Sequence, residues 1–230
     1  SVGNSATLSG GYAWVDGRFG KAAQFDGTGY AGLDLNLLSP QFTASMWVKL
    51  NTTDGGGLLG TEAGPNGIMF YNDVDGGLTV TIFNGAGLGG NISGPSLSTG
   101  SWHHVAVSFD GSFLALYRNG EQVARSPATY APGTAGAVVG RIRSGRFLRG
   151  TVDDFRFVDR ALTRAELLRE FRSGYQAIYT SNAWTTWRQA PVDFAGAQQG
   201  QPGPNILTAG PMPMGLSVSS NTAQFLIEDA

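Results

Sequence analysis

Carboxylates are the first residues to weigh, because two of them held close together can carry out acid–base or nucleophilic chemistry. Enzymes that cleave glycosidic bonds with retention place two carboxyl groups about 5 Å apart. Asp153 and Asp154 are adjacent on a predicted strand, so their side chains are expected on opposite faces of its sheet. Asp73 and Asp75 stand before two glycines and are predicted to lie in a turn. This hydrolysis needs acids two or four residues apart on one strand, and neither the adjacent pair nor the pair in a turn provides them, so the sequence disfavours a hydrolase.

The two histidines and the glycine-rich loops offer no stronger catalytic motif. His103 and His104 are neighbours on a predicted strand, where they point to opposite faces and cannot readily share one metal ion. The chain has no cysteine, which excludes a thiolate nucleophile. It also has no Gly-x-Ser-x-Gly sequence, the tight turn that presents the nucleophilic serine in many hydrolases. The glycine-rich run at residues 85–90 lacks a following Lys-Ser/Thr, so it is predicted to be a β loop. The sequence therefore predicts a protein that is not an enzyme.

Calcium is the one cofactor for which the acidic residues make a case. Asp153 has the same strand parity as Phe155 and Phe157, so it is expected to face the core, where a carboxylate must be hydrogen-bonded or metal-bound. Asp26 lies beside a predicted Gly-Thr-Gly turn, and calcium binds six to eight oxygen ligands. Asp26 and Asp153 are therefore candidate calcium ligands. The alternative is that Asp26 caps its turn and Asp153 accepts backbone amides.

The rest of the sequence predicts an all-β protein, whose strands would position the acidic and histidine residues. The signals are alternating apolar residues and tight-turn dipeptides. Asp110-Gly111 and Asn119-Gly120 tolerate the backbone of tight hairpins, which predicts an antiparallel meander over residues 102–125. Strands without intervening helices favour a sandwich or barrel. Period-two alternation selects the residues expected to be buried between two sheets. They are Phe42, Met46, Val48, Val105, Val107, Phe109, Phe155 and Phe157.

One short helix is predicted after the last of these strands. Thr163 and Glu166 have the spacing of a capping box, and Leu162 and Leu167 have that of a hydrophobic staple. Gly174 is a natural stop. We expect this helix to close one end of the sandwich.

Composition limits the partners that the chain can have. Among 230 residues there are 35 glycines, 14% are charged and the net charge is −2, so no broad basic surface for nucleic acid is expected. The one local basic cluster, at residues 141–149, is interpreted as the solvated end of a hairpin. No apolar stretch is long enough to insert into a membrane. The first residues lack the features of a signal peptide, and simple loss of an initiator methionine is expected.

The composition changes after residue 174, which divides the chain into a domain over 1–174 and an extension over 175–230. Five prolines between residues 191 and 213 prevent a continuous strand or helix, although apolar residues are scattered through the extension. We expect an arm that docks on another subunit; the alternative is an arm that folds back on its own domain. The predicted docking residues are Tyr179, Trp184, Trp187, Phe194 and Phe225.

Several stretches, taken in order, resemble the laminin G-like, concanavalin A-like family. They are residues 17–27 (GRFGKAAQFDG), 42–48 (FTASMWV), 102–111 (WHHVAVSFDG), 116–121 (LYRNGE), 150–157 (GTVDDFRF) and 160–162 (RAL). The resemblance runs over residues 12–172 and implies a two-sheet antiparallel jelly roll. It also permits calcium at loops or sheet edges. Hydrolases of this architecture carry a series of acids along one strand of the concave face, and this chain has no such series.

Two kinds of function follow as expectations. The first is a non-catalytic structural or adhesion module of a larger assembly, such as the exterior of a bacteriophage particle, with other protein subunits or copies of itself as partners. The second is a lectin module that binds cell-surface glycans, for which an aromatic platform is needed. Both place the protein on a virion or an extracellular surface. The candidate platform aromatics are Trp14, Tyr30, Trp47, Tyr71 and Trp102.

Overall fold

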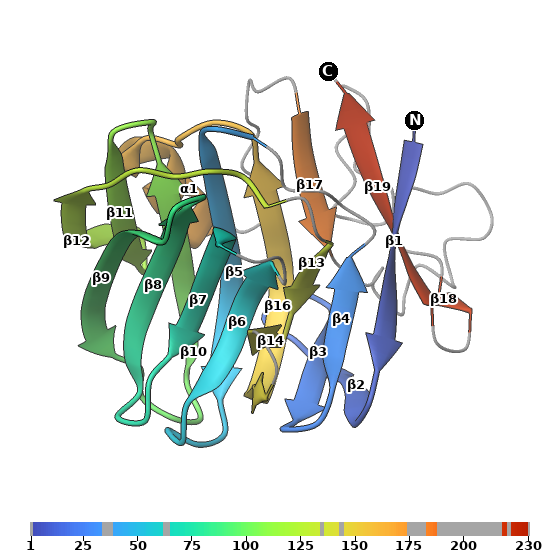
Figure 1. The fold of residues 1–230 in the computed structure, drawn as a ribbon. Coiled ribbons are helices and arrows are strands. Elements are labelled where there is room, and N and C mark those ends of the chain that lie inside the picture. The colour runs from blue at the N-terminus through green and yellow to red at the C-terminus, as the bar shows by residue number, and fades with distance from the viewer. Residues whose placement is uncertain are drawn as a thin grey trace.

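The protein is an antiparallel β-sandwich with a single short helix in the part of the chain that the structure describes, as the sequence predicted (Figure 1). The computed structural model describes residues 2–33, 39–61, 65–133, 136–142, 145–173, 183–187, 218–219 and 222–229. Two layers of strands face each other, and we call them the front layer and the back layer.

The front layer has the strand order β9-β8-β7-β6-β13-β4-β1. Its strands are β1 (Val2–Ser9), β4 (Tyr30–Leu33), β6 (Gly56–Thr61), β7 (Asn66–Asn72), β8 (Gly77–Asn84), β9 (Leu88–Ser96) and β13 (Ala137–Val139). A separate two-stranded hairpin, β14 (Arg141–Ile142) and β15 (Arg146–Phe147), follows β13. This hairpin becomes important for the candidate site.

The back layer has the strand order β12-β11-β10-β5-β16-β3-β2. Its strands are β2 (Tyr12–Asp16), β3 (Lys21–Asp26), β5 (Phe42–Leu50), β10 (Trp102–Phe109), β11 (Phe113–Arg118), β12 (Glu121–Pro127) and β16 (Arg149–Val158). The predicted meander is therefore β10-β11-β12. Its second turn has the predicted backbone, with φ of 53° at Asn119 and 80° at Gly120.

The core lies between the two layers and includes nearly all of the residues that alternation selected. Seven of the eight predicted core side chains are at most 2% exposed. The eighth, Phe157, is half-buried and stacks on Phe42 with ring centroids 5.9 Å apart. Burial of these large apolar groups is the main driving force for the sandwich.

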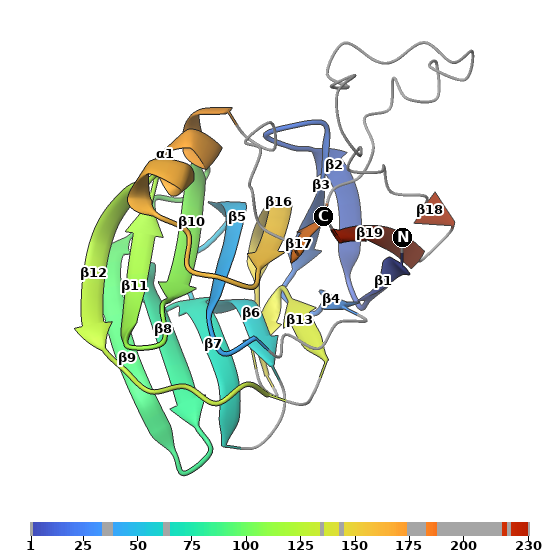
Figure 2. The ribbon, with the colours of Figure 1, turned by 90° about the horizontal axis from the view of Figure 1, so that it is seen from above.

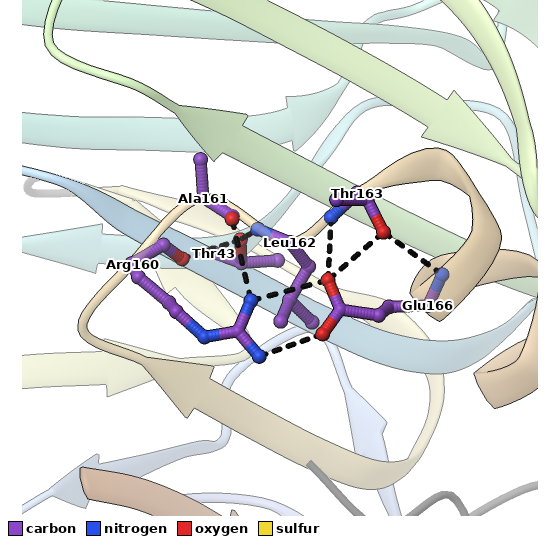
Figure 3. A network of polar contacts seen from close by, with 6 residues as sticks. All are labelled: Thr43, Arg160, Ala161, Leu162, Thr163 and Glu166. Atoms are coloured by element: carbon purple, nitrogen blue, oxygen red, sulfur yellow. Dashed lines mark hydrogen bonds and ion pairs between the residues drawn. The ribbon is translucent and has the colours of Figure 1, made fainter. Parts of the chain in front are cut away.

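Helix α1 (Arg164–Ser173) begins at the predicted capping box. The Thr163 amide donates to Glu166 Oε2 (2.8 Å), and the Glu166 amide donates to Thr163 Oγ1 (3.3 Å). Figure 3 shows Arg160 facing the same carboxylate, to which it donates from both Nη atoms at 2.7 and 3.1 Å. These hydrogen bonds, with that of Arg160 the largest contribution, lower the pKa of Glu166 to about 2.

The expectation that this helix closes one end of the sandwich is wrong. Helix α1 lies on the outer face of the back layer (Figure 2), where Leu167 is buried with Ala106 and Tyr117. Those two strand residues alternate with core residues, so they point away from the sandwich interior. The apolar side of the helix packs there against Ala106, Ala115 and Tyr117, which form an apolar patch on the outer face of β10 and β11.

Strands from the C-terminal part of the chain also pair with this sandwich. They are β17 (Ala183–Trp187), β18 (Val218–Ser219) and β19 (Thr222–Asp229). Strand β17 pairs with β16 and β19, and β19 pairs with β1, so hydrogen bonds join the two layers along one side. For these segments the backbone folds back on its own domain, which is the arrangement that the sequence analysis gave as the alternative.

Only three of the five predicted docking residues lie in the part of the chain that the structure describes. Tyr179 and Phe194 lie outside the described residues. Trp184 and Trp187 are on β17, opposite Val158 and Phe155 of β16, and Phe225 is on β19, opposite Asn4 of β1. Docking of the extension on another subunit stays a prediction.

Candidate functional site

The prediction that Asp153 faces the core is wrong, because β16 contains a β-bulge. The pairing of β16 with β5 shifts by one residue between Asp153 and Arg156, and Asp154 has a φ of 50°. The bulge inverts the alternation, so Val152 and Phe155 both enter the core. Asp153 instead faces the outer side of the back layer, where it is 2% exposed and accepts the Phe19 amide at 2.8 Å.

Asp26 is not brought together with Asp153. Asp26 is opposite Arg149 on β16, four residues from Asp153, which corresponds to roughly 13 Å along a strand. It is exposed and accepts the amide and the hydroxyl of Thr28, both at 2.8 Å. These hydrogen bonds lower the pKa of Asp26. Among the described residues no group of three or more acidic or histidine side chains could hold a metal ion, and calcium binding stays a prediction.

Asp154 belongs instead to a buried ionic cluster beneath helix α1. Arg156 donates to Asp154 (2.9 Å) and to Glu170 of the helix (3.1 Å), and Glu170 also accepts the hydroxyl of Ser45 (2.9 Å). His104 Nε2 is 3.7 Å from Glu170. Burial, aided by the nearby Arg156 charge, lowers the pKa of His104 to about 3, so this imidazole is neutral. The cluster attaches the helix to the sheet, and its members are too buried to meet a substrate.

The other histidine pairs with a serine in a weakly built dyad. His103 Nε2 is 3.0 Å from Ser98 Oγ, while His103 Nδ1 is buried without a hydrogen-bond partner. A serine nucleophile needs a histidine that a third group orients through its other nitrogen. Among the described residues no third group orients His103 through Nδ1, so the pair does not have the arrangement of a triad.

The outer face of the front layer has a different chemistry. Ile68 and Phe70 of β7 and Val80 of β8 point into the core, so the residues that alternate with them point outward. On β8 and β9 these outward residues form what we call the polar ladder, which consists of Thr79, Thr81, Asn91 and Ser93. Thr79 and Ser93 are hydrogen-bonded at 3.1 Å, and Asn91 Nδ2 donates to Thr81 Oγ1 at 2.7 Å. Asn91 and Ser93 are exposed.

The β14–β15 hairpin lies on this same outer face, over β6. Gly57 and Gly60 of β6 pair with the outward residues Tyr71 and Met69 of β7, so a side chain at either glycine would point outward. A Cβ at Gly57 would lie 2.7 Å from the Cα of Arg141, and one at Gly60 would lie 3.0 Å from its carbonyl oxygen. The hairpin can approach so closely because these positions carry no side chain.

The hairpin brings arginines onto the outward aromatic residues of the front layer. The guanidinium carbon of Arg141 lies 4.1 Å from the ring centroid of Tyr30 and 5.7 Å from that of Phe147. That of Arg146 lies 5.1 Å from the centroid of Tyr71. We call these five residues the arginine–tyrosine surface. Tyr71 is also opposite Thr79, so the surface continues directly into the polar ladder.

Parts of this site are visible in the sequence. The sequence indicates Tyr30 and Tyr71 as candidate platform aromatics, and both are half-buried on the outer face. Trp47, by contrast, is 3% exposed beneath Phe171 of the helix, with ring centroids 5.6 Å apart. The sequence predicts the arginines at the solvated end of a hairpin, whereas the structure places Arg141 and Arg146 over aromatic rings. The signal for this arrangement is the pair Gly57 and Gly60, because glycine in a strand can mark the close approach of another chain segment.

The other two candidate aromatics lie elsewhere. Trp14 packs against the core from β2, and Trp102 has the Lys49 ammonium 5.1 Å from its ring centroid on the back layer. Neither belongs to the arginine–tyrosine surface. No helix among the described residues combines the length and the hydrophobicity that crossing a membrane requires.

Comparison with known proteins identifies the family. The sequence model of the concanavalin A-like lectin/glucanases superfamily matches residues 25–168. The chain belongs to this family. No curated protein sequence matches it.

Solved structures with the same fold include several domains of larger proteins. One is domain 4 of AbnA, an extracellular arabinanase from Geobacillus stearothermophilus, which was solved in complex with arabinotriose. It has a TM-score of 0.59 and 24% identity, and the match covers 71% of this chain and 86% of that one. The CBM40 domain of Ruminococcus gnavus IT-sialidase, bound to alpha2,3 sialyllactose, has a TM-score of 0.53 and 19% identity over 64% of this chain and 94% of that one.

A third similar structure is the binding domain of Paraclostridial Mosquitocidal Protein 1. It has a TM-score of 0.61 and 18% identity over 74% of this chain, but the match spans only 48% of that chain. At these identities the similarity establishes the fold that the three structures share with this protein.

Proposed function

We propose that this protein is a non-catalytic module that binds carbohydrate on the outer face of the front layer. The observation that carries the proposal is the polar ladder, in which exposed Asn91 and Ser93 lie beside a surface of aromatic and arginine side chains. Sugar-binding sites combine such aromatic groups with a few well-placed polar groups that bind hydroxyls. Similar domains were solved with arabinotriose and with a sialylated sugar, which supports the same use of the fold here.

The lack of acids on the strands that carry the polar ladder supports a binding role over hydrolysis. Strands β7, β8 and β9 contain no Asp or Glu. Retaining and inverting glycosidases both need two carboxyl groups beside the scissile bond. A sugar held on the polar ladder would meet none on these three strands.

Binding to an oligosaccharide array, followed by calorimetry on the best ligands, tests the proposal. Asn91→Ala and Ser93→Ala should each weaken binding by a factor of about 5 to 30, the effect of losing one hydrogen bond of about 1–2 kcal/mol. Gln122→Ala, which removes an exposed amide from β12 on the back layer, should leave the affinity unchanged. No reducing ends should be released from the bound sugars. Failure to bind any glycan, or turnover that a single Asp or Glu substitution abolishes, would refute the proposal.

We further propose that the module serves as an adhesion subunit of a larger extracellular assembly, such as the exterior of a bacteriophage particle. The proline-rich composition of residues 191–213 supports this role, because such a segment can order on a partner. Sedimentation of the full chain tests the homo-oligomer that we expect. A monomer at all concentrations, with no recruitment to any particle, would contradict it.

A further inference from the structure

We infer that the carbohydrate recognised at this site is acidic, carrying a carboxylate or sulfate that Arg146 and Arg141 bind. This inference rests on the proposed function and specifies its ligand class. It follows from the position of the arginine side chains over the outward tyrosine rings. Both Tyr30 and Tyr71 have a guanidinium over the ring, at 4.1 and 5.1 Å. A neutral sugar that stacked on either ring would compete with that guanidinium for the same face.

Arg146 is placed to bind an anion. Its side chain is 44% exposed, and it makes a contact of 3.3 Å from Nη2 to Asp73. A guanidinium has five N–H donors in one plane and binds carboxylate or sulfate oxygens with two parallel hydrogen bonds. Contact with the Tyr71 ring restrains that plane before ligand binding, which reduces the entropy lost on binding.

Arg141 gives the surface a second positive charge. It lies within reach of the rings of both Tyr30 and Phe147, so its guanidinium is held at the base of the hairpin. Two arginines thus lie on one surface, where Asp73 contacts Arg146. The hairpin fixes both arginines through the close approach of its backbone to Gly57. A fixed pair of cations beside hydroxyl and amide groups suits a sugar that carries an acidic substituent.

The chain contains a matched arginine outside this site. Arg125 of β12 stacks over Phe113 at 3.5 Å, pairs with Asp110 at 3.6 Å and has a side chain that is 43% exposed. It therefore has nearly the same exposure as Arg146, and it also contacts an aromatic ring and an aspartate. It differs in lying on β12 of the back layer, opposite Ala115, whose side chain lies on the outer face of that layer. Arg125→Gln is accordingly the control for Arg146→Gln.

The experiment uses oligosaccharide pairs that differ only in charge. Sialylated and uronic-acid oligosaccharides are compared with their methyl esters, and sulfated oligosaccharides with their desulfated forms, by calorimetry on the full chain. We expect an acidic member to bind at least tenfold more tightly than its neutral counterpart, and to weaken as sodium chloride rises from 50 to 500 mM. Arg146→Gln should remove this preference, Arg146→Lys should retain part of it, and Arg125→Gln should leave it intact.

The outcomes separate this inference from the proposed function. Equal binding of acidic and neutral members would overturn the acidic ligand class and leave carbohydrate binding standing. A charge preference that survives in Arg146→Gln but disappears in Arg125→Gln would overturn the assignment to this surface. If no member of any pair binds, both the inference and the proposed function fail.

Discussion

Substituting Gly57 with alanine tests whether the β14–β15 hairpin is seated on β6 as described. The new methyl group would lie 2.7 Å from Arg141 Cα and still closer to the Arg141 carbonyl carbon and the Ile142 amide nitrogen. Ordinary van der Waals contact begins at 3.4 Å, so the hairpin backbone must move by at least about 0.7 Å. Inserting a methyl group against backbone that cannot rotate away typically costs about 1–3 kcal/mol.

The expected result is loss of stability together with loss of ligand binding. Urea unfolding of Gly57→Ala should show a lower midpoint with an unchanged slope, equivalent to about 1–3 kcal/mol. Affinity for an acidic oligosaccharide should fall at least tenfold, because the displaced hairpin no longer holds Arg141 and Arg146 over their rings. Gly32→Ala is the control, since a methyl group on this front-layer strand meets nothing nearer than 3.8 Å.

Amide chemical shifts decide whether the reasoning is right. In Gly57→Ala the amides of the hairpin, Arg141–Ile142 and Arg146–Phe147, should shift most, and in Gly32→Ala they should not. If Gly57→Ala is as stable as Gly32→Ala and its hairpin amides keep their shifts, the hairpin does not lie against β6.

Three further predictions concern stability. Burial lowers the pKa of His104 to about 3, so near pH 6.5 the unfolded chain binds a proton on this histidine and the folded chain does not. The free energy of unfolding should therefore fall as pH decreases from 6.5 towards 4.5, by up to about 1.4 kcal/mol per pH unit. This pH dependence should be weaker in His104→Gln. Phe109→Ala should cost about 3–5 kcal/mol in urea unfolding, whereas a cost below 1 kcal/mol would contradict its place in the core. If calcium binds at Asp26 or Asp153, calcium should raise the melting temperature relative to a chelator, and equal melting temperatures would rule that site out.

Much of the fold was predictable because its determinants are local. Alternation over residues 42–50 and 105–109 selected the core, and Asn119-Gly120 and the Thr163–Glu166 capping box act within a few residues of chain. Each such signal depends on backbone geometry that neighbouring residues alone decide.

The orientation of Asp153 was not predictable in this way. An aspartate tolerates the left-handed backbone that Asp154 adopts, but nothing in the neighbouring sequence requires a bulge there. One additional residue in β16 reverses the face of the sheet to which the residues on its far side point. Strict alternation therefore placed Asp153 on the wrong side.

The arginine–tyrosine surface depends on topology. Tyr30, Tyr71 and Arg146 come from three separate parts of the chain, which meet only when the hairpin lies on the front layer. The arginines and the tyrosines were each visible in the sequence, but no local signal joined them. The arginines lie over the tyrosine rings only because the hairpin approaches β6 closely.

The location of a bound sugar on the protein decides whether the outer face of the front layer is the binding site. Amide chemical shifts of the full chain, followed during titration with the tightest-binding acidic oligosaccharide, give that location. We expect the largest changes on β7, β8 and β9 and on the β14–β15 hairpin, while β10, β11 and helix α1 keep their shifts. Saturable binding whose largest changes lie on the back layer or beneath helix α1 would contradict it.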